Sequence, residues 1–132
     1  MVGTKEPFIV YLDTHAVMWL HDGLADRFSA TAIRMIEQSR LFVSPIVELE
    51  LAYLREIGRI RPKPQKVIES LASEIGLQYG DYPYRDVVRW ASEQTWTRDP
   101  FDRLIVGETL AAGGYLITRD ELIREHCARA VW

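Results

Sequence analysis

The sequence predicts an α/β fold in which helices cover both faces of a mostly parallel central sheet. Short apolar runs alternate with longer helical patterns, residues that start or stop helices bound most of these patterns, and no repeat or low-complexity segment interrupts them. Such alternation is typical of parallel sheets whose strands are connected through helices. The chain has 132 residues, 48% of them hydrophobic, which is enough for one core. We therefore expect a single domain over residues 1–132.

The first half of the chain contains two predicted strands and three predicted helices. The run at 8–12 is apolar and partly β-branched, which indicates a buried central strand. Ser29 is a good N-cap for an amphipathic helix, and Ser44 followed by Pro45 starts another helix that Gly58 stops. In chain order we expect a strand at 8–12, a helix at 15–20, a polar loop at 21–27, a helix around Ile33 and Ile36, a strand at 41–43 and a helix from 45 to about 57.

The second half of the chain repeats this alternation. A basic loop with two prolines spans 59–64, and Gly76 closes the helix that follows it. Gly113 and Gly114 end the helix that begins at Pro100. In chain order we expect a helix at 65–75, a strand at 77–79, helices at 84–92 and 100–112, a strand at 115–117, a short helix from about 121 and a last strand at 130–132.

Composition limits the functions that the chain can have. With 19 acidic and 16 basic residues the net charge is -3, so no strongly basic face indicates nucleic-acid binding. A bound divalent cation would nevertheless reverse the local sign of an acidic site. The single cysteine, Cys127, cannot form an intramolecular disulfide, which fits a reducing cytosol. Residues 1–7 are polar and no apolar run approaches the ~20 residues of a membrane span, so we expect a cytoplasmic protein without export signal or anchor.

Two acids follow predicted strands. Asp13 comes directly after the strand at 8–12, and two residues separate Asp120 from the strand at 115–117. In parallel α/β sheets the ligand crevice lies beyond the carboxyl ends of the strands, which favours a site here. The alternative is that each aspartate only caps the next helix. Thr118 and Glu121 form a possible capping box, which would free Asp120 from that role.

Two further aspartates stand at the start of the helix at 100–112. Asp99 before Pro100 is typical of an N-cap, and Asp102 suits the positive end of the same helix. Carboxylates that gather at strand ends and helix starts, without a His or Cys cluster, suit Mg²⁺ or Mn²⁺ rather than zinc. Such an ion activates water for attack on phosphorus, as a nuclease requires.

Glu50 is the acid that a capping role does not explain. On a helical wheel it lies within an apolar stripe, which is formed by Ile46, Val47, Tyr53, Leu54 and Ile57. A carboxylate on a core-facing stripe is costly unless it is paired, protonated or near a cation. We therefore expect Glu50 to belong to a buried site, with pairing to a buried arginine as the structural alternative.

Four segments, in this order, resemble the PIN-domain family and within it the VapC toxins of bacterial toxin-antitoxin pairs. The segments are YLDTHAVMWL (11–20), VSPIVELEL (43–51), RDPFDRLI (98–105) and LITRD (116–120). The resemblance covers nearly the whole chain and implies a PIN-like α/β/α sandwich. It also implies a metal-dependent endoribonuclease that uses Mg²⁺, with Mn²⁺ possible, acts on RNA, is neutralised by a VapB-like antitoxin and forms a homodimer.

The resemblance also assigns roles to individual residues. The catalytic acids fall on Asp13, Glu50, Asp102 and Asp120, with Asp99 as a nearby fifth carboxylate. Of these, Asp13, Asp102 and Asp120 are expected to hold the metal, and Glu50 to act through a metal-bound water or as a base. Flanking residues are expected to contact phosphates or pair with the acids (Arg103, Arg119) and to orient carboxylates or water (Thr14, Thr118).

Two rival interpretations deserve comparison. Phosphotransferases with an aspartyl nucleophile carry a second aspartate two residues after the first, where this chain has His15. The stronger rival is a non-catalytic PIN-like module that binds RNA or protein without cleaving it. The presence of all four acids favours the nuclease.

Overall fold

The computed structural model describes residues 8–132, so the expectation for the polar segment 1–7 lies outside the described residues. Within them five strands form one sheet in the order β3-β2-β1-β4-β5, and all neighbouring strands are parallel. The strands are β1 (Ile9–Leu12), β2 (Arg40–Val43), β3 (Gln78–Tyr79), β4 (Tyr115–Ile117) and β5 (Ala130–Val131). The predicted α/β fold and the central place of the first strand are confirmed.

Helices connect the strands, as the sequence predicted, and one short 3₁₀ turn lies inside the predicted polar loop. They are α1 (Thr14–His21), the 3₁₀ turn η1 (Ala25–Arg27), α2 (Ala30–Gln38), α3 (Pro45–Glu56), α4 (Pro64–Ile75), α5 (Tyr84–Ser92), α6 (Pro100–Ala111) and α7 (Glu121–His126). Within residues 8–132, none of them is long and apolar enough to cross a membrane.

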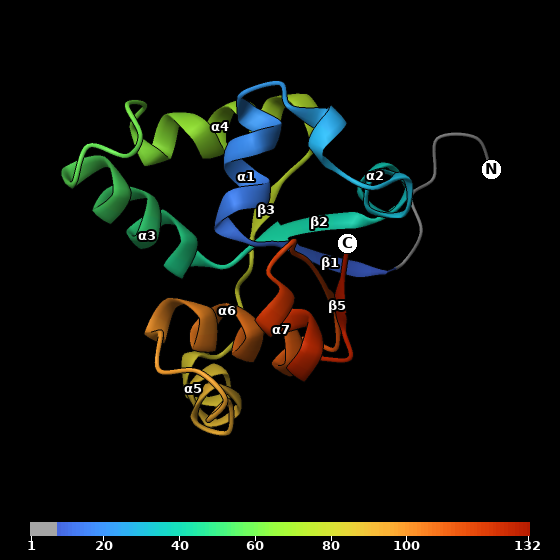
Figure 1. Ribbon diagram of the computed structural model, residues 1–132, viewed down its shortest axis with the longest axis vertical. Helices are drawn as coiled ribbons and strands as arrows, with labels where there is room; N and C mark the ends of the chain where they lie inside the picture. The colour runs from blue at the N-terminus through green and yellow to red at the C-terminus, as the bar shows by residue number, and fades with distance from the viewer. Residues whose placement is uncertain (1–7) are drawn as a thin grey trace.

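The helices cover both faces of the sheet (Figure 1). In this view α1 and α4 lie on one side of the strands, and α5, α6 and α7 lie on the other. Helix α1 belongs to the connection from β1 to β2, and α4 to the connection from β2 to β3. Helices α5 and α6 connect β3 to β4, and α7 connects β4 to β5. The chain thus changes direction at β1, which pairs with β2 on one edge and β4 on the other. Ligand sites of parallel α/β sheets lie at such a switch point, beyond the carboxyl ends of the strands.

The core lies on both faces of the two strands that flank this switch point. Val10 and Leu12 of β1 and Leu116 and Ile117 of β4 are completely buried. Neighbouring residues on a strand point to opposite faces, so continuous burial requires helices on both sides. The apolar run that predicted a buried strand is therefore explained by the helices around it.

Helices α5 and α6 touch through their backbones at Gly107. A Cβ atom added to Gly107 would lie 2.8 Å from the backbone nitrogen of Ala91 and 2.8 Å from the carbonyl oxygen of Val87. A side chain at this position would force the helices apart, because both neighbouring atoms belong to the backbone. The contact fixes the position of α6, which carries Asp102 in its first turn and Glu108 next to the glycine.

Candidate active site

Three strands end at the same edge of the sheet, and each is followed by a polar residue that caps a helix. Asp13 follows β1 and caps α1, and Ser44 follows β2 and caps α3. Asp120 follows β4 by a short turn and caps α7. The backbone nitrogen of Asp13 donates to the carbonyl oxygen of Ile117 at 3.2 Å, which holds the ends of β1 and β4 together. The predicted gathering of polar groups at this edge is thus present.

Asp13 is buried at the centre of this edge, with 7% of its surface exposed. Its Oδ1 atom accepts a hydrogen bond from the backbone nitrogen of Ala16 at 2.8 Å, and the Thr118 hydroxyl donates to Oδ2. Burial raises the pKa of Asp13 and so does the nearby Asp120, while the two hydrogen bonds and His15 act in the opposite direction. Asp13 is therefore both a helix cap and an oriented carboxylate of the site.

Thr118 joins two of the acids. It is completely buried, and besides donating to Asp13 its hydroxyl accepts from the backbone nitrogen of Asp120 at 3.1 Å. Asp120 itself caps α7, because its Oδ1 atom accepts from the backbone nitrogen of Ile123 at 2.9 Å. The expected capping box of Thr118 with Glu121 is wrong, because Asp120 and not Thr118 is the N-cap of α7. The Thr118 hydroxyl is hydrogen-bonded to Asp13 and Asp120 instead.

Glu50 borders the buried side of α3 rather than standing in the middle of it. The buried residues of α3 are Val47 and Leu51, whereas Tyr53 and Ile57 of the predicted stripe are 49% and 50% exposed. Only part of the apolar stripe is covered by neighbouring helices, so the wheel overstated its burial. Glu50 is half-buried and accepts a hydrogen bond from Thr14, the residue after Asp13. Burial raises its pKa, an effect that the Thr14 hydrogen bond opposes.

Asp99 and Asp102 approach the site from the start of α6. Asp99 caps the helix by accepting from the backbone nitrogens of Phe101 at 2.8 Å and Asp102 at 3.3 Å. The side chain of Asp102 has no hydrogen-bond partner among the described residues. Burial first, and then the surrounding acids, raise its pKa to about 7; the acids are Asp99, Asp120, Glu50 and Asp13. The predicted acids are therefore close enough to repel one another.

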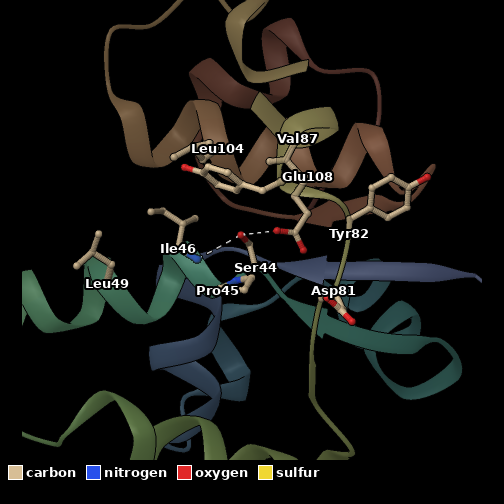
Figure 2. A pocket seen from close by; sticks show the side chains of 11 residues that line it. Ser44, Pro45, Ile46, Leu49, Asp81, Tyr82, Val87, Leu104 and Glu108 are labelled. Carbon is tan, nitrogen blue, oxygen red and sulfur yellow. Dashed lines mark hydrogen bonds between the residues drawn. The ribbon is translucent and has the colours of Figure 1, made fainter. Parts of the chain in front are cut away.

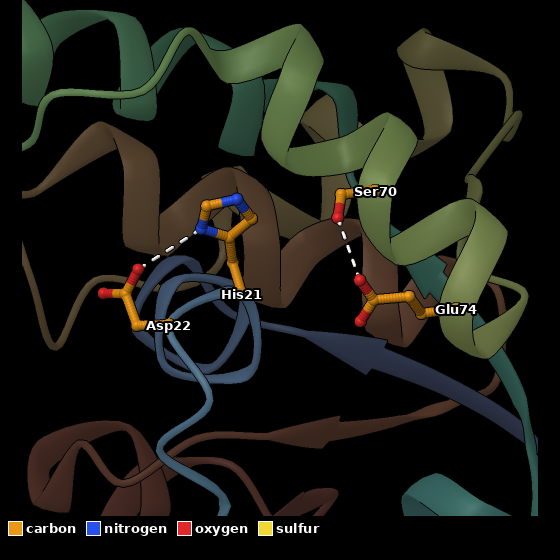
Figure 3. A network of polar contacts seen from close by, with 4 residues as sticks. All are labelled: His21, Asp22, Ser70 and Glu74. Carbon is orange, nitrogen blue, oxygen red and sulfur yellow. Dashed lines mark hydrogen bonds and ion pairs between the residues drawn. The ribbon is translucent and has the colours of Figure 1, made fainter.

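Among the described residues no lysine or arginine forms an ion pair with these acids, and the basic neighbour that lowers the pKa of Asp13 and Glu50 is His15. The ion pair found there joins His21 Nδ1 to Asp22 Oδ1 at 3.2 Å, at the opposite end of α1 (Figure 3). Carboxylates held together without a countercharge are costly unless they bind protons or a cation. The site thus has the electrostatic character of a cation-binding site.

The two arginines beside the acids have other partners. Arg103 donates from Nε to the carbonyl oxygen of Ala91 and from Nη2 to that of Ser92, both at 3.0 Å, and so ties the end of α5 to α6. The Arg119 guanidinium lies 5.8 Å from the centre of the Trp19 ring. Neither pairs with an acid within residues 8–132, so that expected pairing is absent there. Contact of either arginine with RNA stays a prediction.

The donor set fits a hard divalent cation. Among residues 8–132 no three His, Cys, Asp or Glu side chains converge to enclose a metal ion by themselves. Mg²⁺ does not require such an enclosure, because it keeps several waters and uses one or two carboxylates together with substrate phosphates. Oxygen donors and the mutual repulsion around Asp102 both suit such an ion.

Sequence reasoning missed one buried acid, Glu108 on α6. It is 4% exposed, and the Ser44 hydroxyl donates to its Oε1 atom at 2.8 Å (Figure 2). Ser44 was predicted only as a helix cap. A helical wheel drawn for α6 would have found Glu108, because it lies among the buried residues Ile105, Val106 and Thr109.

Fold and site together define a parallel α/β domain with clustered carboxylates at the switch point of its sheet. Comparison with known proteins identifies the family. Residues 10–128 match the PIN domain, and the chain belongs to the PIN domain family.

One curated protein is similar to this chain in sequence, and one solved structure is similar to it in fold. Ribonuclease VapC22 of Mycobacterium tuberculosis is 31% identical over 120 residues, which cover 89% of this chain and 91% of the relative. A chain in the crystal structure of VapBC2 from Rickettsia felis, bound to a DNA fragment from their promoter, has a TM-score of 0.70. That likeness covers 95% of this chain and 98% of the other at 16% identity, so it concerns the fold.

Proposed function

We propose that this chain is a metal-dependent endoribonuclease that serves as the toxin of a VapBC-type toxin-antitoxin pair. The observation that carries the proposal is the group of acids around Asp102. Burial first, and then these acids, raise the pKa of Asp102 to about 7, and none of them forms an ion pair within the described residues. The similarity to a VapC ribonuclease supports RNA as the substrate.

The acids have two tasks in this proposal, metal binding and proton acceptance. Asp13, Asp102 and Asp120 would hold a divalent cation, Mg²⁺ or Mn²⁺, directly or through its bound waters, since the three side chains do not enclose an ion by themselves. When bound, the cation supplies Lewis-acid activation of water and neutralises charge on the phosphodiester. Glu50, oriented by Thr14, accepts the proton of the attacking water. Thr118 fixes the carboxylate of Asp13 and the backbone of Asp120, so that two of the acids keep their places.

The partners follow from the same proposal. The antitoxin is a VapB-like protein, and a basic side chain on it would complement the uncompensated acids. A homodimer is supported by large apolar side chains that lie exposed on α3, at its C-cap and on α5, namely Tyr53, Ile57, Val88 and Trp90. The place of action is the cytoplasm, where RNA is available. Expression without the antitoxin should halt bacterial growth.

The direct test is cleavage of labelled total RNA and tRNA by the purified protein, with Mg²⁺, Mn²⁺ or EDTA. Asp102→Asn is the most informative variant, because the Asp102 side chain caps no helix and makes no hydrogen bond to a described residue. Asp26→Asn, an exposed aspartate of η1, is the matched control. We expect metal-dependent products from the wild type and the control, and none from Asp102→Asn.

The competing function is a PIN-like module that binds RNA or protein without cleaving it. Folded wild-type protein that binds RNA but cleaves none of it with either metal would establish this alternative and overturn the nuclease.

A further inference from the structure

Two exposed arginines share one aromatic side chain, Trp19 of α1. The guanidinium carbon of Arg27 lies 5.4 Å from the centre of the Trp19 ring, and that of Arg119 lies 5.8 Å from it. Within residues 8–132 neither arginine forms an ion pair with a carboxylate. A cation–π contact orients a guanidinium without neutralising its charge. We call Arg27 and Arg119 the arginine pair.

The ring under the arginine pair is packed into the fold. Trp19 meets Phe28 edge-on, with 6.1 Å between ring centres, and Trp132 at 5.8 Å. Phe28 and Trp132 stack on each other at 4.7 Å. Phe28 is buried, and the two tryptophans are partly buried against the core. Because such aromatic contacts are favourable, they hold Trp19 in one place.

The sheet places these rings at the edge that carries the acids. The backbone nitrogen of Thr118 donates to the carbonyl oxygen of Val131 at 3.0 Å, so Trp132 follows β5 beside Thr118. Thr118 is the residue that binds Asp13 and Asp120. In the chain, Arg119 stands between Thr118 and Asp120.

His15 connects Trp19 to the acids from the other side. Its ring centre lies 6.0 Å from that of Trp19. Burial raises the pKa of Asp13 and of Glu50, and His15 opposes this shift in both. Trp19 is therefore one turn along α1 from a residue that acts electrostatically on two of the acids.

A phosphodiester backbone can supply the countercharge that the arginine pair lacks. A guanidinium donates paired hydrogen bonds to phosphate oxygens. The acidic neighbours in the chain do not occupy these donors, because Asp26 forms no ion pair with Arg27 and Asp22 pairs with His21 instead. A strand that reaches the acids carries further phosphates, and the arginine pair lies beside that edge to receive them.

We propose that Arg27 and Arg119, held by Trp19, bind two backbone phosphates of single-stranded RNA beside the phosphodiester that reaches the acids. The inference rests on the proposed ribonuclease function. Trp19 is a positioning residue, because it acts through the two guanidinium groups. Contacts with phosphates carry no sequence information, so the arginine pair holds RNA of any sequence in place.

The salt dependence of RNA binding in EDTA counts these phosphate contacts. The full-length protein is titrated with a short fluorescein-labelled oligouridylate at several NaCl concentrations, and fluorescence anisotropy gives the affinity. Each phosphate contact to a single strand contributes about 0.7 to the slope of log affinity against log salt concentration. We expect Arg27→Gln and Arg119→Gln each to lower the magnitude of this slope by about 0.7, and the affinity in about 0.1 M NaCl by about fivefold.

Arg34→Gln is the matched control. Arg34 is an exposed arginine of α2, the helix that leads into the start of β2 at the opposite edge of the sheet. This variant should keep the slope and the affinity of the wild type. Because Arg27 and Arg119 are exposed as well, all three variants should fold.

The positioning role of Trp19 has its own readout. Trp19→Leu should weaken RNA binding in the wild type but have no further effect in a protein that already carries Arg27→Gln and Arg119→Gln. A merely structural role of Trp19 would weaken binding equally in both backgrounds, and that result would refute the positioning role.

Three results would overturn the phosphate contacts. They are unchanged slopes in Arg27→Gln and Arg119→Gln, an equal loss in Arg34→Gln, and no RNA binding in EDTA. Binding of an oligoglutamate peptide through the arginine pair where RNA does not bind would also overturn them, because the pair would then suit an acidic protein segment. RNA binding that depends on both arginines, without cleavage in Mg²⁺ or Mn²⁺, would overturn the nuclease and leave the contacts standing, so the two failures are distinguishable.

Discussion

At the scale of single residues, two buried threonines organise the acids. Thr14 donates to Glu50, and Thr118 donates to Asp13 while accepting from the backbone of Asp120. Both threonines are almost fully buried, so these hydrogen bonds compete little with water. Carboxylates oriented in this way need less rearrangement when a cation or substrate arrives.

Thr118→Val tests this organisation with a side chain of nearly the same shape. Removal of the hydroxyl leaves a carboxylate oxygen of Asp13 and the backbone nitrogen of Asp120 without their partner, so we expect cleavage to fall about 10–100-fold. Stability should fall by about 1–3 kcal/mol. The measurement is RNA cleavage at equal concentrations of folded protein, with Thr31→Val on the exposed face of α2 as the control. Wild-type cleavage by Thr118→Val would contradict an orienting role.

Asp102 gives a prediction on pH and stability. Its pKa is 3.8 ordinarily and about 7 in the folded protein, so the folded state holds the proton more tightly than the unfolded state. Without metal, the stability that protonated Asp102 contributes is lost as pH rises through about 7. We expect Asp102→Asn to be more stable than the wild type at pH 8 by on the order of 1 kcal/mol, after allowance for solvent screening. The measurement is thermal unfolding in EDTA, in which the stabilities of Asp102→Asn and the wild type should become equal near pH 4. Equal stability of the two proteins at pH 8 would contradict the raised pKa of Asp102.

The residues that sequence reasoning found and missed differ in one respect. Acids at strand ends and helix starts were predictable, because caps and the ends of parallel strands have fixed places in the chain. The partners of Arg103 depend instead on how α5 and α6 pack, which no local pattern specifies. Glu108 is predictable in principle, because it shares the buried face of α6 with Ile105, Val106 and Thr109. Glu50 was predictable in part. The helical wheel indicated on which face of α3 it lies, but not how deeply it is buried.

At the scale of elements, helix and strand positions were largely predictable from caps, prolines and glycines. Ser29, Ser44 and Asp99 cap helices as expected, and Gly76 ends α4 in the left-handed conformation with φ 74°. Alternation indicated the parallel sheet, but the order of its strands depends on side-chain packing between distant segments. The 3₁₀ turn η1 within the polar loop carried no recognisable signal.

Gly107→Ala tests the contact between α5 and α6. The added methyl group would overlap the backbone of α5, so we expect a loss of about 1–3 kcal/mol in unfolding free energy and a weaker cleavage activity, because α6 carries Asp102. The control is Gly23→Ala, which has no atom within 4 Å but a φ of 73°. It should cost stability through local strain alone and leave cleavage unchanged. A Gly107→Ala protein as stable and active as the wild type would show that the helices can separate freely.

At the scale of the whole molecule, the fold brings helix starts and strand ends together at one edge. The helices α1 and α3 begin one residue after β1 and β2, and α7 begins after a short turn that follows β4, so their positive ends lie near the points where those strands stop. These ends partly offset the acids and are also suited to phosphate. A protein with a net charge of -3 can thus offer a local site for RNA without a basic surface.

The central claim is that these acids hold the catalytic cation, and Mn²⁺ binding measured by electron paramagnetic resonance tests it most directly. Titration of the wild type should show a protein-bound Mn²⁺ population that Mg²⁺ displaces. Asp102→Asn should bind Mn²⁺ about 10–100-fold more weakly, whereas Asp26→Asn should bind like the wild type. Equal Mn²⁺ affinity in the wild type and Asp102→Asn, with both proteins folded, would contradict the assignment of the site.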